Sequence, residues 1–337
     1  MRSTGAIYHP NRNTGFQPTA AASMADKDKS PLLRLAGLKS SQLPAATASP
    51  EELTPFITAL LEEAVPFIDT SAPRAADFTD PAVPAPPASN TLWKPRGTKS
   101  HPDSTAKIEL SERVVSGEGQ QQETWACRRS VHADAASKGT ASWAEFGDCI
   151  RDRHAETEDA FTPTVLAHRE AVSWGSAAAA PHVWAGGIAW GRFSLSLVEM
   201  KHKIPPPLKP RVFPVLQLVA SAVPGGGGDG GAAGAERDEF VVVSVTVYDL
   251  ATGQLKDKAA LSVEKGVVVG TYVSVERVRR LPGRGEDKGK IEWIMATASD
   301  AKGVLPMFLQ TKAVPGQIAK DVGMFLGWVD KERAKKG

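Results

Sequence analysis

The sequence has few cysteines, almost no net charge and no long apolar run. Only 2 of its 337 residues are cysteine, Cys127 and Cys149, which is too few for a disulfide framework and typical of a reducing compartment. Lys and Arg number 40 against 38 Asp and Glu, so the chain lacks the positive field that holds nucleic acid. The most apolar stretch, 211–223, contains Pro214 and Gln217 and is shorter than the roughly 18–20 residues that span a membrane. We therefore expect a protein that neither crosses a membrane nor binds nucleic acid.

The N-terminal composition bears on location. The first 25 residues carry Arg, Ser and Thr but no acid before Asp26, which is typical of a mitochondrial presequence. Glycines and prolines within the same stretch oppose the amphipathic helix that such a signal needs, and Met24 is an alternative start to Met1. We expect a cytoplasmic protein, with mitochondrial targeting as the weaker alternative.

Composition divides the chain into segments of different character. Residues 1–48 show no sustained periodicity and predict a disordered leader, whereas apolar residues recur at helical spacing over 49–65 and predict an amphipathic helix. Prolines are concentrated in 66–106, which predicts a linker. Residues 107–335 are patterned throughout, apart from a glycine-rich stretch at 224–238 that predicts a flexible insertion. The sequence therefore predicts one folded domain with unstructured additions.

The order of elements within that domain indicates its fold class. Short β-rich runs follow one another without helices between them, at 193–204, 212–222, 240–248, 267–278 and 291–299. Consecutive strands joined by loops form antiparallel sheets. Apolar residues then recur at helical spacing as far as Val329. We expect an α+β fold in which an antiparallel sheet is followed by a long C-terminal helix.

Several motifs resemble those of a known family. The segment 300–308, Asp-Ala-Lys-Gly-Val-Leu-Pro-Met-Phe, resembles the signature with which StAR-related lipid-transfer (START) domains begin their C-terminal lid helix. Arg211-Val-Phe213 resembles an Arg-x-Phe in a central strand of that family. Four further segments resemble a fungal START-like family of unknown function: 125–132, 138–143, 272–277 and 291–300. The likeness covers about residues 107–334.

This resemblance implies a helix-grip fold, in which a curved antiparallel sheet wraps around the C-terminal helix. It also implies an interior cavity that holds one hydrophobic small molecule or lipid. We expect binding, and with it transfer, without covalent catalysis and without a cofactor. Transfer would involve transient contact with a membrane surface. The sequence does not indicate an oligomeric state.

Candidate lining residues are the apolar and aromatic side chains of the predicted strands and C-terminal helix. They are Met200, Val243, Val245, Tyr272, Val273, Trp293, Met295, Phe308, Ile318, Val322 and Phe325. Three polar residues, Arg129, His202 and Arg277, are candidate anchors for a polar group of the ligand. Arg277 has the parity of Val273 along its strand, which predicts either a β-bulge or an arginine that reaches into the cavity and pairs with an anionic headgroup. Ordinary core packing is the alternative for each valine.

Two other functions are compatible with the same predicted strands and C-terminal helix. An aromatase/cyclase-like enzyme would shape a hydrophobic substrate in the same cavity, and would require Arg, Tyr or His side chains to converge inside it. A protein-interaction module would instead have a filled core. Metal binding is not expected, because the repeated spacing of Cys127 with His132 and of Cys149 with His154 lacks the closely spaced cysteine pairs of structural zinc sites.

Overall fold

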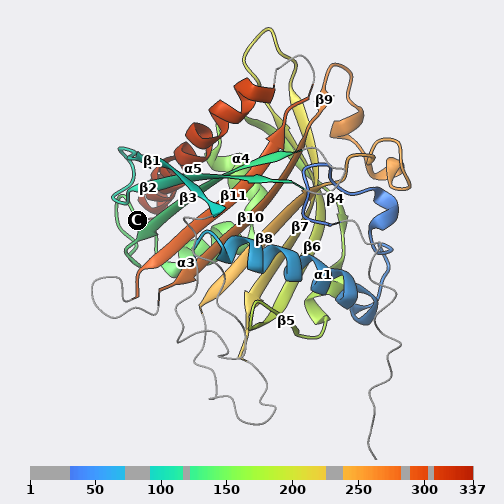
Figure 1. The fold of residues 1–337 in the computed structure, drawn as a ribbon, viewed down its shortest axis with the longest axis horizontal. Helices are drawn as coiled ribbons and strands as arrows, with labels where there is room; N and C mark the ends of the chain where they lie inside the picture. The colour runs from blue at the N-terminus through green and yellow to red at the C-terminus, as the bar shows by residue number, and fades with distance from the viewer. Residues whose placement is uncertain are drawn as a thin grey trace, which may run out of the picture. The chain divides into compact units, whose positions relative to one another are not determined.

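The computed structural model describes residues 31–72, 92–116, 122–224, 238–281, 289–302 and 307–336, with the backbone alone for 307–312. Within these residues one sheet of eleven strands runs in the order β1-β2-β3-β11-β10-β8-β7-β6-β4, with β5 beside β6 and β9 beside β7 (Figure 1). The strands are β1 Lys94–Lys99, β2 Ile108–Val115, β3 Glu123–His132, β4 Val165–Ser173, β5 Val183–Ala185, β6 Ile188–His202, β7 Arg211–Ala222, β8 Glu239–Thr246, β9 Val268–Val269, β10 Thr271–Arg280 and β11 Ile291–Asp300. Every pairing is antiparallel except that of β7 with β9.

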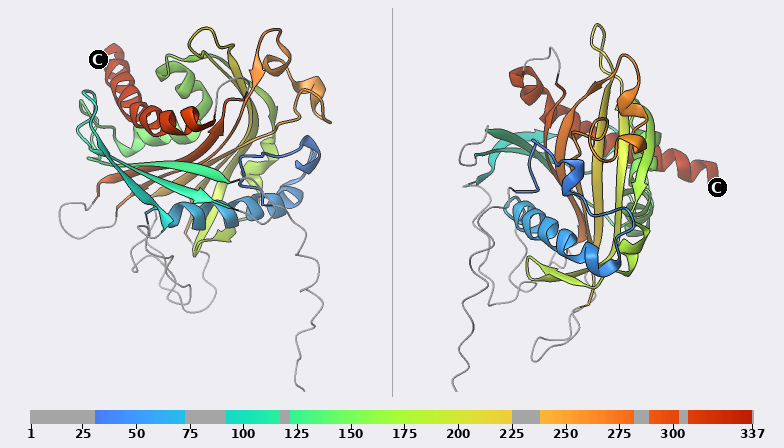
Figure 2. Two further views of the ribbon diagram at one scale, coloured as in Figure 1. Left: turned by 45° about the horizontal axis from the view of Figure 1, so that its top comes forward. Right: turned by 90° about the vertical axis from the view of Figure 1, so that its right-hand side faces the viewer.

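Helices cover both faces of this sheet. They are α1 Pro50–Asp69, α3 Trp143–Phe146, α4 His154–Phe161 and α5 Met307–Lys336, with short helical turns η1 Ser40–Gln42, η3 Gly147–Asp152, η4 Gly175–Ala179, η5 Lys256–Lys258 and η6 Leu261–Val263. The sheet curves around α5, and α1 lies on the opposite side (Figure 2). We name the side that holds α5 the concave face and the side that holds α1 the convex face. The predicted α+β fold, a curved antiparallel sheet around a C-terminal helix, is confirmed.

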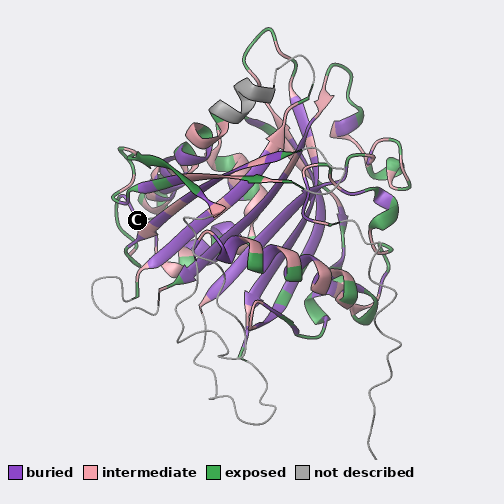
Figure 3. Ribbon diagram, in the orientation of Figure 1, coloured by how far each residue is buried: buried purple, intermediate pink, exposed green. Residues whose placement is uncertain are grey.

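Strand β8 shows why both faces are apolar. All eight of its residues are buried, because successive side chains point to opposite faces and both faces are covered (Figure 3). Val241, Val243 and Val245 pack in the cluster that contains α1. Phe240 and Val242 pack in the cluster that contains α5. Burial on two sides produces the continuous apolar run seen in the sequence.

The N-terminal part differs from the prediction. Leu33 and Leu38 are buried in the core, and Leu38 forms a β-bridge with Val247, so residues 32–48 are packed against the domain. Helix α1 begins at the Ser49 cap, whose side chain accepts a hydrogen bond from the backbone N–H of Glu52, and continues to Asp69. Single residues such as Leu33 and Leu38 make the contacts of residues 32–48. The sequence of this segment therefore shows no hydrophobic periodicity from which packing could be predicted.

The predicted linker 66–106 is also partly structured. It contains the end of α1, the buried Trp93 and strand β1. The remainder of the predicted leader and linker, 1–30 and 73–91, and most of the glycine-rich insertion lie outside the described residues. None of the described helices is long and apolar enough to span a bilayer.

Candidate functional site

The concave face carries a row of neutral polar side chains. Ser196 lies opposite Gln217, Gln217 opposite Ser244, Ser244 opposite Ser274, and Ser274 opposite Thr297. These five residues of β6, β7, β8, β10 and β11, which we name the polar row, therefore stand at one level of the sheet. All five are buried, with exposed fractions of 2% to 9%.

Apolar side chains flank the polar row on both sides. Val219 lies opposite Val242 in one flanking level, and Val198 lies opposite Val215 in the other. Tyr272 lies near the second level, where its hydroxyl shares a hydrogen bond with Ser244, and burial raises the pKa of that hydroxyl. The concave face thus offers bands of apolar and neutral polar surface, which suits an amphipathic molecule.

A groove of about 370 Å³ opens at one end of the polar row. It lies between the η3–α4 segment and strands β4, β6 and β7. Its lining residues are Arg151, Asp152, Arg153, His154, Ala155, Glu156, His168, Arg169, Glu170, Ser194, Ser196, Val198, Gln217 and Val219. Two members of the polar row, Ser196 and Gln217, therefore belong to its wall.

The first two arginines of the groove are neutralised by nearby acids. Arg151 donates two hydrogen bonds to Asp152, at 2.7 and 2.9 Å. Arg153 pairs with Asp148 and, at 3.0 Å, with Glu156. The hydrogen bonds from Arg153 lower the pKa of Asp148, so this pair stays ionised at neutral pH.

The β4 side of the groove is neutralised in the same way. Arg169 donates to Glu199 at 3.2 Å and to the carbonyl of Lys258 at 2.7 Å. His168 Nδ1 lies 2.6 Å from a carboxylate oxygen of Asp159. No arginine that lines the groove is left without an acidic partner.

A charged cluster lies deeper under α5. Glu276 accepts hydrogen bonds from Arg128 at 2.9 Å and from the indole N–H of Trp293 at 2.6 Å. The guanidinium of Arg128 stacks over the Trp293 ring, 4.0 Å from its centroid. His154 Nδ1 lies 2.9 Å from the carbonyl of Ile150 and 3.9 Å from Glu276. These contacts hold Arg128 in place by a carboxylate and an aromatic ring together.

Asp321 of α5 faces this cluster. Burial raises the pKa of its carboxyl to about 7, and the charges of Glu158 and Glu276 act in the same direction against the opposing effect of Arg128. No hydrogen bond or ion pair is recorded for its side chain within the described part of the chain. The region under α5 therefore contains a half-buried carboxyl group that is partly protonated at neutral pH.

Several predicted lining residues lie on the concave side. Trp293, Val322 and Phe325 pack in one cluster, and the rings of Trp293 and Phe325 are 5.2 Å apart. Met200 packs in a second cluster, which Tyr272 contacts.

Three further concave-side candidates lie outside these two clusters. Met295 is half-buried in the middle of β11, and Ile318 is buried on α5. His202 contacts the ring of Phe213 at 5.5 Å, and burial lowers its pKa. Phe308 lies in the part of α5 for which only the backbone is described.

The structure corrects the placement of the other candidates. Val243, Val245 and Val273 pack with α1 on the convex face, away from α5. Arg129 and Arg277 have the same parity and lie on the same side. Alternation along a strand separates two faces but does not say which face holds the C-terminal helix. These five residues therefore do not line the concave face.

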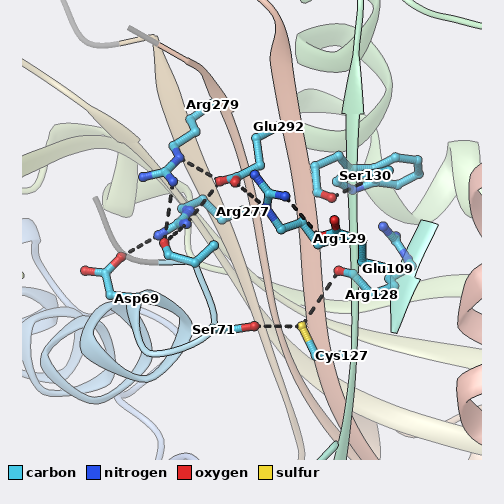
Figure 4. A network of polar contacts seen from close by, with 12 residues as sticks. Asp69, Ser71, Glu109, Cys127, Arg128, Arg129, Ser130, Arg277, Arg279 and Glu292 are labelled. Carbon is cyan, nitrogen blue, oxygen red and sulfur yellow. Dashed lines mark hydrogen bonds and ion pairs between the residues drawn. The ribbon is translucent and has the colours of Figure 1, made fainter. Parts of the chain in front are cut away.

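Arg277 has protein partners in place of the expected ligand headgroup. It bonds Asp69 of α1 and Glu292 of β11, the latter at 3.2 Å (Figure 4). Arg279 and Arg129 also donate to Glu292, each at 2.7 Å. Although burial alone would raise the pKa of Glu292, the guanidinium groups of Arg279, Arg277 and Arg129 lower it to about 2. Neither a bulge nor a bound anion is needed to explain Arg277.

The cysteine–histidine spacing does not bring these residues together. Cys127 packs on the convex side, where its sulfur lies 3.1 Å from the hydroxyl of Ser71, whereas His132 lies on the concave side. Burial raises the pKa of Cys127 to about 11 and that of Cys149 to about 12, so both remain thiols. Across the described residues, no group of three or more potential ligands is arranged to hold a metal ion.

Comparison with known proteins identifies a family of unknown function. A family model described as a protein of unknown function (DUF3074) matches residues 125–329. No curated protein matches the chain. Among solved structures it is similar to human STARD10, with 13% identity, coverage of 73% of this chain and 76% of that chain, and a TM-score of 0.47. It is also similar to the human StarD13 (DLC2) lipid transfer and protein localization domain, with 13% identity, coverage of 70% and 88%, and a TM-score of 0.41. A third is human StAR-related lipid transfer protein 5, with 14% identity, coverage of 70% and 86%, and a TM-score of 0.40.

Proposed function

The chain belongs to the DUF3074 family of unknown function, so its activity has to be argued from its own residues, and we propose that it binds a hydrophobic small molecule or lipid on the concave face. The observation that carries the proposal is a difference in packing between the two faces of the same strands. On the convex face Val243, Val275 and Ile294 are 0% exposed. On the concave face Gln217 is 8% exposed, and Met295 is half-buried in the middle of β11.

A side chain on an inner strand that keeps solvent-accessible surface lacks close-packed neighbours. A protein interior packs to the density of an organic crystal, so a side chain covered by close-packed neighbours loses its accessible surface. Val243, Val275 and Ile294 fulfil this on the convex face, whereas Met295 and Gln217 do not fulfil it on the concave face. Open space lies at the Ser196–Gln217 end of the polar row, where Val198 and Val219 offer apolar surface to a ligand.

We propose binding without catalysis, because two candidate catalytic groups of the concave face, Arg128 and Tyr272, already have protein partners. Arg128 is held by Glu276 and stacked on Trp293. Tyr272 shares its hydroxyl with Ser244. A binding protein that carries its ligand between membranes would contact a membrane surface transiently, which we propose as the second part of this function.

Native mass spectrometry tests the proposal. Protein purified from its own host is expected to carry a hydrophobic molecule, which organic extraction then identifies. Met295→Trp adds volume at the half-buried position of β11 and is expected to abolish the adduct without loss of melting temperature. Val275→Ile adds volume to the packed convex face of β10 as a control, and is expected to keep the adduct while it lowers stability by roughly 1–3 kcal/mol.

Two results would contradict the proposal. Wild-type protein without any adduct, together with a Met295→Trp variant destabilised as much as Val275→Ile, would mean that the concave face is as tightly filled as the convex face. The alternative of a protein-interaction module with a filled core would then be the better description.

A further inference from the structure

We propose that the groove beside α4 binds a neutral, hydroxyl-rich headgroup, such as a sugar or another polyol. This inference rests on the proposed function, because it names the polar end of the amphiphile whose apolar part lies on the concave face. The groove is formed by the η3–α4 segment and strands β4, β6 and β7.

The wall of the groove contains polar side chains without partners in the described part of the protein. Gln217 is 8% exposed and Ser196 is 9% exposed, and neither side chain makes a hydrogen bond to any described residue. A carboxamide offers two N–H donors and a carbonyl acceptor, and a hydroxyl both donates and accepts. Because no described protein group bonds them, water or a ligand in the groove supplies their partners. A ligand that carries several hydroxyl groups can satisfy both donors and acceptors at once.

The charges around the groove oppose an ionic headgroup. A phosphate or carboxylate requires an available cation, whereas Arg151, Arg153 and Arg169 are each bound to an acidic side chain. An anion would also meet Glu170, which is exposed and lines the groove. The groove is lined by three arginines and by three acids, Asp152, Glu156 and Glu170, so it offers no net charge of either sign to a headgroup. This balance favours an uncharged group.

The size and apolar surface of the groove fit the same class of molecule. Its volume of about 370 Å³ lies near the lower end of small-molecule pockets, which span roughly 300–1,000 Å³. Val198 and Val219, both at least nine-tenths buried, stand on either side of Gln217 in the wall. A sugar ring has hydroxyl groups at its edge and C–H groups on its faces, so its edge can meet Gln217 while a face packs on a valine.

The groove is continuous with the rest of the concave face. Gln217 lies opposite Ser244, and Val219 opposite Val242, on the next strand inwards. A headgroup in the groove would therefore have its attached chain beside Val198 and Val219, the apolar residues of the same wall. The headgroup site and the hydrophobic site thus adjoin at the edge of the concave face.

Calorimetric titration with three probes that share one alkyl chain tests the inference: octyl β-D-glucoside, 1-octanol and octyl phosphate, each below its micelle concentration. The glucoside is expected to bind at least about tenfold more tightly than either other probe, since it adds several hydrogen bonds. Gln217→Leu is expected to remove this preference and leave the affinity for 1-octanol unchanged. Ser221→Ala is the matched control, because Ser221 is a buried, unpartnered hydroxyl on β7 that does not line the groove.

The outcomes separate this inference from the proposed function. If 1-octanol binds as tightly as the glucoside, the groove holds water only, and the inference is overturned while hydrophobic binding stands. If octyl phosphate binds most tightly, the headgroup is anionic and the inference is overturned. If Gln217→Leu weakens all three probes equally, Gln217 is a structural residue and the assignment fails. If no probe binds to the wild-type protein, the proposed function fails, and this inference with it.

Discussion

The carboxylate of Asp69, the last residue of α1, accepts a hydrogen bond from the guanidinium of Arg277 on strand β10. The same guanidinium donates to the carbonyl of Ala72 at 2.8 Å and to Glu292 at 3.2 Å. Arg277 is 0% exposed, so its charge is compensated entirely by protein groups. Helix α1 is thereby tied to the sheet by polar contacts as well as by apolar packing, although it precedes the residues that match the family model.

Loss of this buried ion pair is expected to be costly. Asp69→Asn leaves Arg277 with less compensating charge in a buried position, and we expect the free energy of unfolding to fall by about 3–5 kcal/mol. Urea denaturation measures the loss. Glu332→Gln, which breaks the exposed pair with Lys335, is the control and is expected to cost less than about 1 kcal/mol. Equal losses in the two variants would show that the buried pair adds nothing to the attachment of α1.

Removal of α1 is expected to prevent stable folding. Val241, Val243 and Val275 lie beneath the helix, and its deletion would expose them to water as one apolar patch. A chain that begins at residue 31 is expected to melt like the full-length protein, whereas one that begins at residue 107 is expected to aggregate. Size-exclusion chromatography and thermal melting distinguish the two. A monomeric, cooperatively melting chain from residue 107 would contradict an integral role for α1.

The sequence predicts which residues of a strand share one face of the sheet. It does not predict which face is covered by α1 and which by α5. Alternation correctly groups Val243, Val245 and Val273 together, and this grouping is confirmed by their shared cluster. Their assignment to the side of α5 is wrong, because both sides of the sheet are covered by helices and both sides are therefore apolar. Only the contact of α1 with the convex face decides the question, and α1 lies far away in the sequence.

The polar row shows a second limit of sequence reasoning. Ser244 and Gln217 each interrupt an apolar strand. A single polar residue in such a strand is common and does not by itself indicate a binding site. Their alignment depends on the register between β7 and β8, which the residues between those strands do not specify. Sequence reasoning misses Asp321 for a related reason: an acid in a C-terminal helix is normally exposed, and the burial and the nearby Glu158 and Glu276 that raise its pKa depend on tertiary packing.

His132 is expected to make the protein sensitive to mild acid. Burial, and then the charge of Arg128, lowers its pKa to about 4, whereas an unfolded histidine titrates near 6.5. The unfolded state therefore binds the proton first, and the contribution of the neutral imidazole to stability is lost as pH falls from about 6.5 to 4. His132→Phe is expected to remove up to about 3 kcal/mol of that dependence. Urea denaturation at pH 8, 6 and 4.5 measures it, and an unchanged slope in the variant would contradict the assignment.

Asp321 is expected to have the opposite pH dependence. Its pKa of about 7 lies above the ordinary value near 4, so the folded state retains a proton that the unfolded state has released. Stability is then greatest below about pH 4 and falls as pH rises to about 7. Asp321→Asn removes the burial of a charge, and we expect a gain of about 2–4 kcal/mol at pH 8 and almost none at pH 4. A gain that is equal at both pH values would show that the carboxyl does not titrate in this range.

Val322 is expected to behave as a core residue of α5. It is 0% exposed and packs in the cluster of Trp293 and Phe325, so the helix is anchored here by direct contact with the sheet. Val322→Ala leaves a cavity at a packed site, and we expect a loss of roughly 1–3 kcal/mol in the ligand-free protein. Val322→Asp places a charge in the same position and is expected to unfold the domain.

The Val322→Ala variant also separates anchoring of α5 from contact with the ligand. If Val322 packs only on protein, the affinity for a fluorescent fatty or sterol probe is expected to remain unchanged while the ligand-free melting temperature falls. Lys320→Ala, at an exposed position two residues earlier, is the control for helix propensity and is expected to change neither quantity. If Val322→Ala instead weakened the probe and left the ligand-free melting temperature intact, this turn of α5 would face the ligand. The helix would then be a lid over an open cavity, because only a side chain without close-packed protein neighbours can lose two methyl groups without loss of stability.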